Sequence, residues 1–185
     1  IGHQKGRDTK QKVFRNFVEG SGGLSGRPDD SIGLVSFGGF PEDRCPLTLD
    51  HGWLRQNLAR AKVGMIEDGT AVGAGIATSV NRLRASTAKS KFVVLLTDGQ
   101  QNAGTIAPHT AAEAAAALGI KVYTVGAGTR GTAPYPATDL FGNKVYRPIS
   151  VDIDEDALKK VAEITKARYF RATDTASLRE VYGEI

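Results

Sequence analysis

One short run of the sequence limits the fold more than any other. Phe92 to Leu96 are five consecutive apolar residues, and Thr97, Asp98 and Gly99 follow them directly. A short apolar run bounded by turn residues is typical of a β-strand buried on both faces, as in a parallel sheet covered by helices. A transmembrane helix needs about 20 apolar residues, so this run does not indicate one. We therefore expect a buried strand over 92–97.

The rest of the chain alternates between helical and strand patterns. Apolar spacing and capping residues predict helices over 9–19 and about 70–84, a short helix near Trp53, an Ala-rich helix opened by a Thr110–Glu113 capping box, a helix capped by Asp154 and a last helix over 178–185. Strands are expected over 31–38, 92–97, 120–125 and 168–172, and residues 126–150 are expected to form a long loop or a hairpin. Cys45 is expected in a loop, in a packing role.

This alternation predicts an α/β fold with a doubly wound, mostly parallel central sheet flanked by helices on both faces. The 185 residues, of which 41% are apolar, suit a single domain over 1–185. The net charge of +4 indicates solubility rather than a dedicated binder of polyanions. Ligands of such sheets bind beyond the carboxyl ends of the strands, and Asp98 follows one of these ends.

Asp98 and Thr70 are the two residues with the clearest chemical signal. A carboxylate at a strand end can offer oxygen to a hard cation such as Mg²⁺, and the Thr70 hydroxyl, beside Gly69, can do the same. The structural alternatives are simple. Asp98 before Gly99 is a common turn pair, and Thr70, or Asp68 in its place, can cap a helix. Residue types alone leave both alternatives open.

Longer segments resemble a known family. FVVLLTDGQQNAG, DGTAVGAGIATSVNRL and DSIGLVSFGG together resemble the von Willebrand factor A (vWA) domain. CPLTLDHGWL, AAEAAAALGIKVYTVGAG and ARYFRATDTASLREVY resemble its bacterial aerotolerance-operon (Bat-type) branch. The likeness covers the chain from about residue 9 to the end, and it implies the Rossmann-like vWA fold.

The resemblance implies a metal-ion-dependent adhesion site (MIDAS), in which Thr70 and Asp98 match two of the three ligand motifs. The cation, Mg²⁺ or else Mn²⁺ or Ca²⁺, would leave one coordination position for an acidic side chain of a protein partner. Gly69, Gly99, Gln101 and Asn102 would form the partner-binding rim. The amides of Gln101 and Asn102 can donate hydrogen bonds to a partner, but solvated loop side chains are an equal alternative.

The sequence departs from the family pattern in one motif. D-x-S-x-S, which carries the remaining ligands at the end of the family's first and central strand, does not occur in the 185 residues. An empty place in the sheet would leave backbone donors and acceptors unpaired. We therefore expect the domain to be N-terminally incomplete, or the strand to come from another segment. Two ligands alone would give poor metal affinity.

The resemblance also implies a function. Bat-type relatives are held in the bacterial inner membrane by flanking segments, and they are associated with MoxR-type AAA+ ATPases in stress tolerance or protein assembly. We expect a non-enzymatic, cation-dependent protein-binding module of this kind. The alternative is a vWA-like scaffold with a non-functional metal site. The chain opens with IGHQKGRDTK, which has no signal-peptide pattern, so we expect a soluble domain.

Other motifs carry weaker signals. GAGTRG (126–131) fits G-x-G-x-x-G, but Pro134 and Pro136 follow where a dinucleotide site needs a helix. The three histidines are scattered and no G-x-S-x-G occurs, so no hydrolase is indicated. NRLRASTAKSK (81–91) places cations near a helix C-terminus, where they are favourable, with an anionic partner as the alternative. Since no aromatic residues interleave these charges, we expect no nucleic-acid binding.

Overall fold

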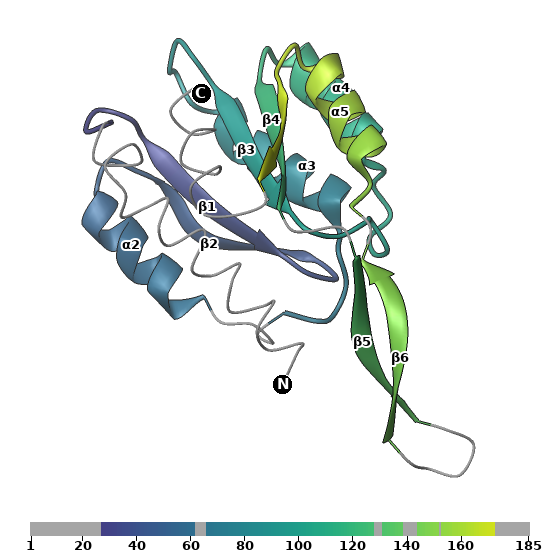
Figure 1. Cartoon of the computed structure of the whole chain (residues 1–185). Coiled ribbons are helices and arrows are strands. Elements are labelled where there is room, and N and C mark those ends of the chain that lie inside the picture. The colour runs from purple at the N-terminus through teal and green to yellow at the C-terminus, as the bar shows by residue number, and fades with distance from the viewer. Residues whose placement is uncertain (1–26, 62–65, 128–130, 139–143, 152, 173–185) are drawn as a thin grey trace.

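A computed structural model of the chain describes residues 27–61, 66–127, 131–138, 144–151 and 153–172 (Figure 1). The helices expected over 9–19 and 178–185 lie outside these residues. The described elements are β1 (Ile32–Phe37), β2 (Pro41–Thr48), α2 (His51–Arg60), α3 (Val72–Arg84), β3 (Phe92–Thr97), α4 (Pro108–Ala117), β4 (Lys121–Ala127), β5 (Gly131–Thr138), β6 (Lys144–Val151), α5 (Glu155–Ile164) and β7 (Tyr169–Ala172).

A parallel sheet forms the centre of the fold, with strand order β3–β4–β7. At the amino end of β3, Phe92 pairs with Lys121 of β4, and at its carboxyl end Thr97 pairs with Gly126 of β4. The strand expected over 92–97 is confirmed as β3. Its residues alternate between the two faces, and both faces are apolar, which is the pattern of a strand covered on both sides.

Two antiparallel hairpins accompany this sheet. β1 pairs with β2, and β5 pairs with β6, which confirms a hairpin for most of the 126–150 segment. Figure 1 shows the β5–β6 hairpin extending away from the carboxyl end of the parallel sheet. β1 and β3 share no ladder among the described residues, so the expected central sheet is present in two parts.

Helix α3 covers both parts of the divided sheet. Its Gly75 lies against the Phe37 ring at the end of β1, where an added Cβ would lie 3.0 Å from the ring. Its Ile76 and Val80 pack in one buried cluster with Val93 of β3. Helix α3 therefore holds β1 and β3 in place relative to each other, although no backbone hydrogen bonds join these two strands in the described part of the chain.

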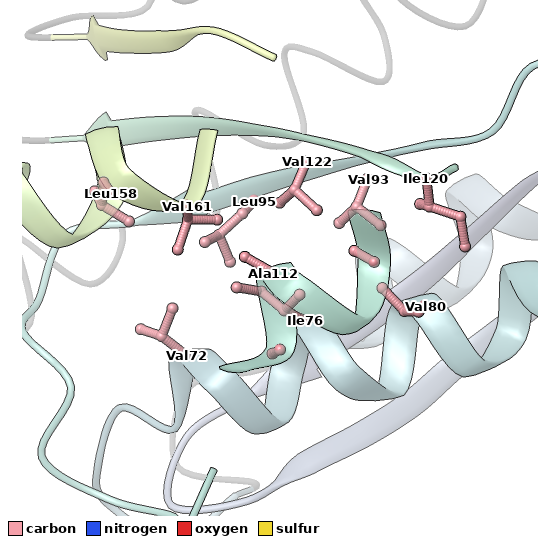
Figure 2. Close-up of a cluster of buried hydrophobic side chains, with 12 residues drawn as sticks. Val72, Ile76, Val80, Val93, Leu95, Ala112, Ile120, Val122, Leu158 and Val161 are labelled. Carbon is pink, nitrogen blue, oxygen red and sulfur yellow. The ribbon is translucent and has the colours of Figure 1, made fainter. Parts of the chain in front are cut away.

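The main core lies between the parallel sheet and helices α3, α4 and α5, as Figure 2 shows. Its buried members are Val72, Ile76, Val80, Val93, Leu95, Ala111, Ala112, Ala115, Ile120, Val122, Leu158 and Val161. Helix α2 packs on the β1–β2 hairpin through Leu54, against Cys45, Ile32 and Leu34. In β1, Ile32 and Leu34 thus face α2 while Phe37 packs on the α3 side, so the described helices flank the strands on both faces.

Two local expectations are wrong. Cys45 does not lie in a loop but is buried in β2, a strand that the sequence pattern did not indicate. The Thr110–Glu113 capping box is absent, because α4 begins at Pro108 and its N-cap is Ala107, three residues before Thr110. The helix expected over about 70–84 is confirmed as α3, which begins at Val72 with Ala71 as N-cap. Proline is favoured in the first turn because its missing N–H costs nothing there, which explains the start of α4.

Candidate functional site

Two strand ends and one helix start meet at the carboxyl edge of the sheet. The Ala71 amide donates to the carbonyl of Gly38, directly after β1, over 2.8 Å. The Gly39 amide donates to the Glu67 carbonyl, also over 2.8 Å. Asp98 follows β3 at the same edge. The segment 66–71 therefore joins the end of β1 to the start of α3, beside the end of β3.

The Thr70 side chain lies close to Gly99, the residue that follows Asp98. A Cβ built on Gly99 would lie 3.2 Å from Thr70 Oγ1. Thr70 is not the N-cap of α3, because Ala71 occupies that position and no side chain caps it. The helix-cap alternative for Thr70 is therefore wrong, and its hydroxyl lies against the backbone next to Asp98.

Thr97 stabilises the turn after β3. The Gly99 amide donates to Thr97 Oγ1 over 3.3 Å. Because this buried hydroxyl belongs to the last residue of the strand, it holds the backbone in place where Asp98 leaves the sheet. Asp98 is itself half-buried. The backbone that carries Asp98 and the Thr70 side chain, from two separate loops, thus lie near each other at this edge.

Gln101 and Asn102 tie the two loops together. The side-chain oxygen Oδ1 of Asn102 accepts a hydrogen bond from the backbone N–H of Thr70 over 2.8 Å. The backbone N–H of Asn102 donates in return to the Thr70 carbonyl over 3.2 Å. Gln101 Oε1 accepts from the Gly73 amide over 2.8 Å, while its Nε2 donates to the Ile106 carbonyl over 2.9 Å. Both side chains thus satisfy backbone groups at the start of α3, which has no cap of its own. Their role in contacting a partner stays a prediction.

Gly69 allows the loops to approach each other. Its φ of +145° is a conformation that side-chain-bearing residues rarely adopt. An added Cβ would lie 2.9 Å from both the Ala103 Cβ and the Gly39 Cα, so the space is closed as well. Gly69 therefore has a structural reason to be at this rim, whether or not it contacts a partner.

The oxygens of Thr70 and Asp98 are suited to a hard cation, which prefers hydroxyl, carboxylate and water ligands. Within the described residues no group of three or more His, Cys, Asp or Glu side chains is gathered to hold a metal. Thr70 and Asp98 therefore fit such an ion as a partial ligand set, two of the three motifs that the family pattern requires.

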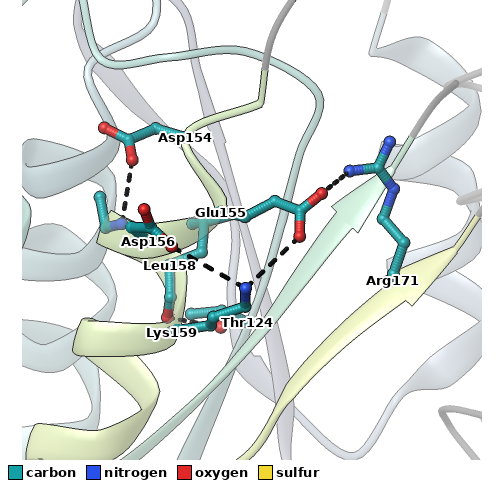
Figure 3. A network of polar contacts seen from close by, with 8 residues as sticks. Thr124, Asp154, Glu155, Asp156, Leu158, Lys159 and Arg171 are labelled. Atoms are coloured by element: carbon teal, nitrogen blue, oxygen red, sulfur yellow. Dashed lines mark hydrogen bonds and ion pairs between the residues drawn. The ribbon is translucent and has the colours of Figure 1, made fainter. Parts of the chain in front are cut away.

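The carboxylates further along this edge have other partners, as Figure 3 shows. Arg171 pairs with Gly126 in the row that also contains Thr97, so it lies at the same edge of the sheet as Asp98. Glu155 forms ion pairs with Arg171 and, over 3.6 Å, with Lys159. Asp154 Oδ1 caps α5 by accepting from the Ala157 amide over 3.0 Å. Glu155 thus stabilises the α5–β7 contact and Asp154 the start of α5, so both are poor candidates for completing the site.

The ion pair between Glu155 of α5 and Arg171 of β7 was not predicted from the sequence. Glu155 and Arg171 are 16 residues apart and belong to α5 and β7, so no spacing pattern relates them. Their neighbour Tyr169 has a buried hydroxyl, and burial is the main cause that raises the pKa of this phenol above its ordinary value. Asp154, by contrast, was a residue that a capping pattern could predict, and its role is confirmed.

The remaining sequence motifs do not add a second site. His51 Nε2 lies 2.8 Å from the Asp30 carbonyl, beside the start of α2. The segment after GAGTRG forms the strand β5 rather than the helix that a dinucleotide site requires. None of the helices in the described ranges has both the length and the apolarity needed to span a membrane.

Comparison with known proteins identifies relatives of the whole arrangement. The model of the von Willebrand factor type A domain family matches residues 4–184. An uncharacterised protein of Borreliella burgdorferi is 32% identical over 108 residues, which are 58% of this chain and 32% of that protein. The matched region thus spans about a third of the length of that relative.

Two solved structures are also similar. An aerotolerance-related membrane protein from Bacteroides fragilis superposes with a TM-score of 0.75 at 22% identity, over 96% of this chain and 86% of that one. Proximal thread matrix protein 1 of the mussel byssus, with a zinc-occupied MIDAS motif, gives a TM-score of 0.61 at 16% identity, over 96% of this chain and 39% of that one. At these identities the similarity establishes the fold.

Proposed function

This chain belongs to the von Willebrand factor type A family, and on that premise we propose that it is a non-enzymatic module that binds another protein through a divalent cation. Thr70 and Asp98 would hold the ion, and an acidic side chain of the partner would complete its coordination. The closeness of Thr70 Oγ1 to Gly99, which follows Asp98, is the observation that carries this proposal: a Cβ added to Gly99 would lie 3.2 Å from that hydroxyl.

The chemistry of the two loops supports this role. A bound Mg²⁺ or similar ion would supply a positive charge that offsets the negative charge of a partner carboxylate. The protein's own contribution is to hold two oxygen ligands close together. Gln101 and Asn102 do this by joining the Asp98 loop to the Thr70 loop with side-chain hydrogen bonds. Zinc in the MIDAS motif of the mussel byssus protein supports the presence of such sites in this fold.

The D-x-S-x-S motif would contribute the remaining protein ligands, and it does not occur in this sequence. In the family such a motif follows a strand between the positions of β1 and β3. These two strands are both held on α3 and share no ladder in the described part of the chain. A further strand between them would satisfy the backbone groups of both edges and bring its ligands to the Thr70–Asp98 edge.

The cellular role extends the proposal further. By resemblance to Bat-type proteins, the partner would be a MoxR-type AAA+ ATPase or a protein assembled with its help, in stress tolerance. The whole protein would be anchored in the bacterial inner membrane, with this domain exposed to solvent. The similarity to an aerotolerance-related membrane protein supports this setting.

A metal-free scaffold is the second candidate. The observation that favours it is the absence of D-x-S-x-S from the sequence, together with the lack of a three-residue acidic or histidine cluster among the described residues. A scaffold of this kind would bind partners through its surface alone.

The two candidates are separated by removing one ligand charge in the full-length protein. Asp98→Asn should abolish the rise in melting temperature on adding Mg²⁺ or Mn²⁺, since a ligand that binds only the folded state stabilises it. Glu113→Gln, the same change at an exposed position on α4, is the matched control and should leave the rise intact. If Asp98→Asn keeps both the stabilisation and partner binding, the metal-dependent function is wrong and the scaffold remains.

A further inference from the structure

The amino edge of the parallel sheet gathers basic side chains from separate parts of the sequence. Lys121 opens β4 next to the start of β3, and its amide donates to the Lys91 carbonyl over 3.2 Å. Arg168 directly precedes β7, and its carbonyl accepts from the Thr124 amide of β4 over 3.2 Å. Lys91 thus lies beside Lys121, and Arg168 lies beside Thr124, three residues further along β4. In Figure 1 this edge is at the top, and the β5–β6 hairpin is at the opposite end.

The charge of this edge is strongly one-sided. Residues 84–92, 117–121 and 163–169, which form it, carry six cationic side chains: Arg84, Lys89, Lys91, Lys121, Lys166 and Arg168. All except Lys91 are exposed. The same segments carry one carboxylate, Glu163, whose charge is already paired with Lys160 over 3.1 Å. The preference of cations for the carboxyl end of a helix explains Arg84 on α3. It does not explain Lys89 and Lys91, which lie just before the strand β3.

An exposed apolar side chain lies at the same edge. Leu118, in the turn between α4 and β4, is 42% exposed and stands three residues before Lys121. The turn is closed by hydrogen bonds from the amides of Leu118 and Ile120 to the Ala115 carbonyl, so the backbone that carries this side chain is held in place. An apolar side chain among lysines matches an anionic lipid surface, where the apolar group enters the interface and the ammonium groups meet the phosphates.

Neither of the two aromatic residues in these segments, Phe92 and Tyr169, offers an exposed stacking surface for bases, since both are half-buried. The Phe92 ring is half-buried and packs edge-to-face with Tyr123, with a centroid separation of 5.9 Å. The guanidinium of Arg27 lies 5.7 Å from its centre and is paired with Asp30 over 3.3 Å, so these two residues leave the charge of the edge unchanged. Nonspecific binding of single-stranded nucleic acid relies on exposed aromatic platforms as well as on positive charge. The lipid surface therefore fits this edge better than a nucleic acid does.

We propose that the edge formed by Arg84, Lys89, Lys91, Leu118, Lys121, Lys166 and Arg168 binds the surface of an anionic phospholipid bilayer. Docked in this way, the domain turns the opposite edge, with Thr70 and Asp98, away from the membrane. The inference does not depend on whether a cation binds at that opposite edge.

Vesicle co-sedimentation of the 185-residue chain tests the proposal. Binding is expected to phosphatidylcholine vesicles that contain phosphatidylglycerol, to weaken with added salt, and to be absent with phosphatidylcholine alone. Each lysine near an anionic surface changes the partition coefficient by about fivefold, so Lys89→Gln with Lys121→Gln should lower it by about 25-fold. Leu118→Ser should also weaken binding without changing net charge.

The control variant removes the same charge elsewhere. Arg55→Gln with Arg60→Gln, on α2, should leave vesicle binding within about twofold of the unchanged protein. Equal binding to both kinds of vesicle, or equal loss in the α2 variant, would overturn the proposal. Displacement of the protein from anionic vesicles by an equal charge concentration of single-stranded DNA would overturn it as well, because the edge would then be a general polyanion site.

Discussion

At the scale of single residues, the space between Thr70 and Gly99 determines whether two oxygens can share a cation. Gly99→Ala would place a Cβ 3.2 Å from Thr70 Oγ1 and force the hydroxyl to shift. We expect cation affinity to fall by about 10- to 100-fold, as when the groups that orient a metal ligand are altered. Thr70→Val, which removes the hydroxyl itself, should lower the affinity at least as much. Calorimetric titration of Mn²⁺ into the full-length variants measures both.

The exposed Thr105, in the loop after β3, provides the matched control for this pair of variants. Thr105→Val should leave the affinity unchanged. Unchanged cation binding in Gly99→Ala would mean that the Thr70 hydroxyl is not a ligand, even if Asp98 is.

Cys45 gives a pH dependence of stability. Burial in β2, and secondarily the negative charges of Asp43 and Asp50, raise the pKa of this thiol above its ordinary value. The folded state therefore keeps its proton at a pH where the unfolded chain has lost it. The stabilisation that comes from the protonated thiol is complete below about pH 8.5, the pKa of the thiol in the unfolded chain. It is lost as pH rises through the higher pKa of the thiol in the folded state.

We expect the urea midpoint to fall between about pH 7.5 and 9.5, and to fall less in Cys45→Ala, which has no thiol to ionise. The difference between the two proteins isolates the thiol from all other titrating groups. An identical decline in both would contradict the assignment.

At the scale of elements, the start of α3 depends on a side chain from another loop. Gln101 bonds both the Gly73 amide and the Ile106 carbonyl, whereas its neighbour Gln100 is exposed. Gln101→Ala should lower the free energy of unfolding by about 1–2 kcal/mol, the usual cost of losing a helix N-terminal partner. Gln100→Ala should change it by less than about 0.5 kcal/mol. Urea denaturation of both variants measures the difference, and equal effects would refute the role of Gln101.

How far the sequence predicts an element depends on whether its signal is local. β3 was predicted with its observed bounds, because an unbroken apolar run ends at Thr97 and a turn follows. β2 was missed because Pro41–Thr48 contains three charged residues and two prolines. This segment forms a strand through its pairing with β1. The Thr110 cap was predicted wrongly because a Ser/Thr–x–x–Glu pattern also fits positions inside a helix that begins at a proline.

The candidate site likewise contains residues that a local sequence signal predicts and contacts that no local signal predicts. Asp98 was found from its place at a strand end and Thr70 from its place beside Gly69 at an expected helix start, and the resemblance then matched both to the ligand motifs. Their shared position follows from parallel strands that end at one edge. The hydrogen bonds of Gln101 and Asn102 reach 28 and 32 residues back along the chain, so no local pattern could indicate them.

At the scale of the whole molecule, α3 joins parts of the sheet that the described strands leave separate. Ile76 of α3 is fully buried in the main core (Figure 2). Ile76→Ala should cost about 2–5 kcal/mol in unfolding free energy, because the cavity lies where helices and sheet meet. Ile106→Ala, the same change at a side chain that is 37% exposed, should cost less than about 1.5 kcal/mol. Chemical denaturation distinguishes the two, and similar losses would contradict a core centred on α3.

The two edges of the parallel sheet differ in chemistry. The carboxyl edge presents Asp98 beside Thr70, and the amino edge presents Lys89, Lys121 and their neighbours. The protein partner proposed for the carboxyl edge and the bilayer proposed for the amino edge would therefore not block each other.

The central claim is that a divalent cation lies between the Thr70 and Asp98 loops, and paramagnetic broadening by Mn²⁺ tests it most directly. In the full-length protein with assigned backbone amides, substoichiometric Mn²⁺ should broaden the signals of Thr70 and Gly99 before any others, and Asp98→Asn should remove the effect. Broadening that begins instead at the exposed Asp156 on α5, or that persists in Asp98→Asn, would contradict the claim.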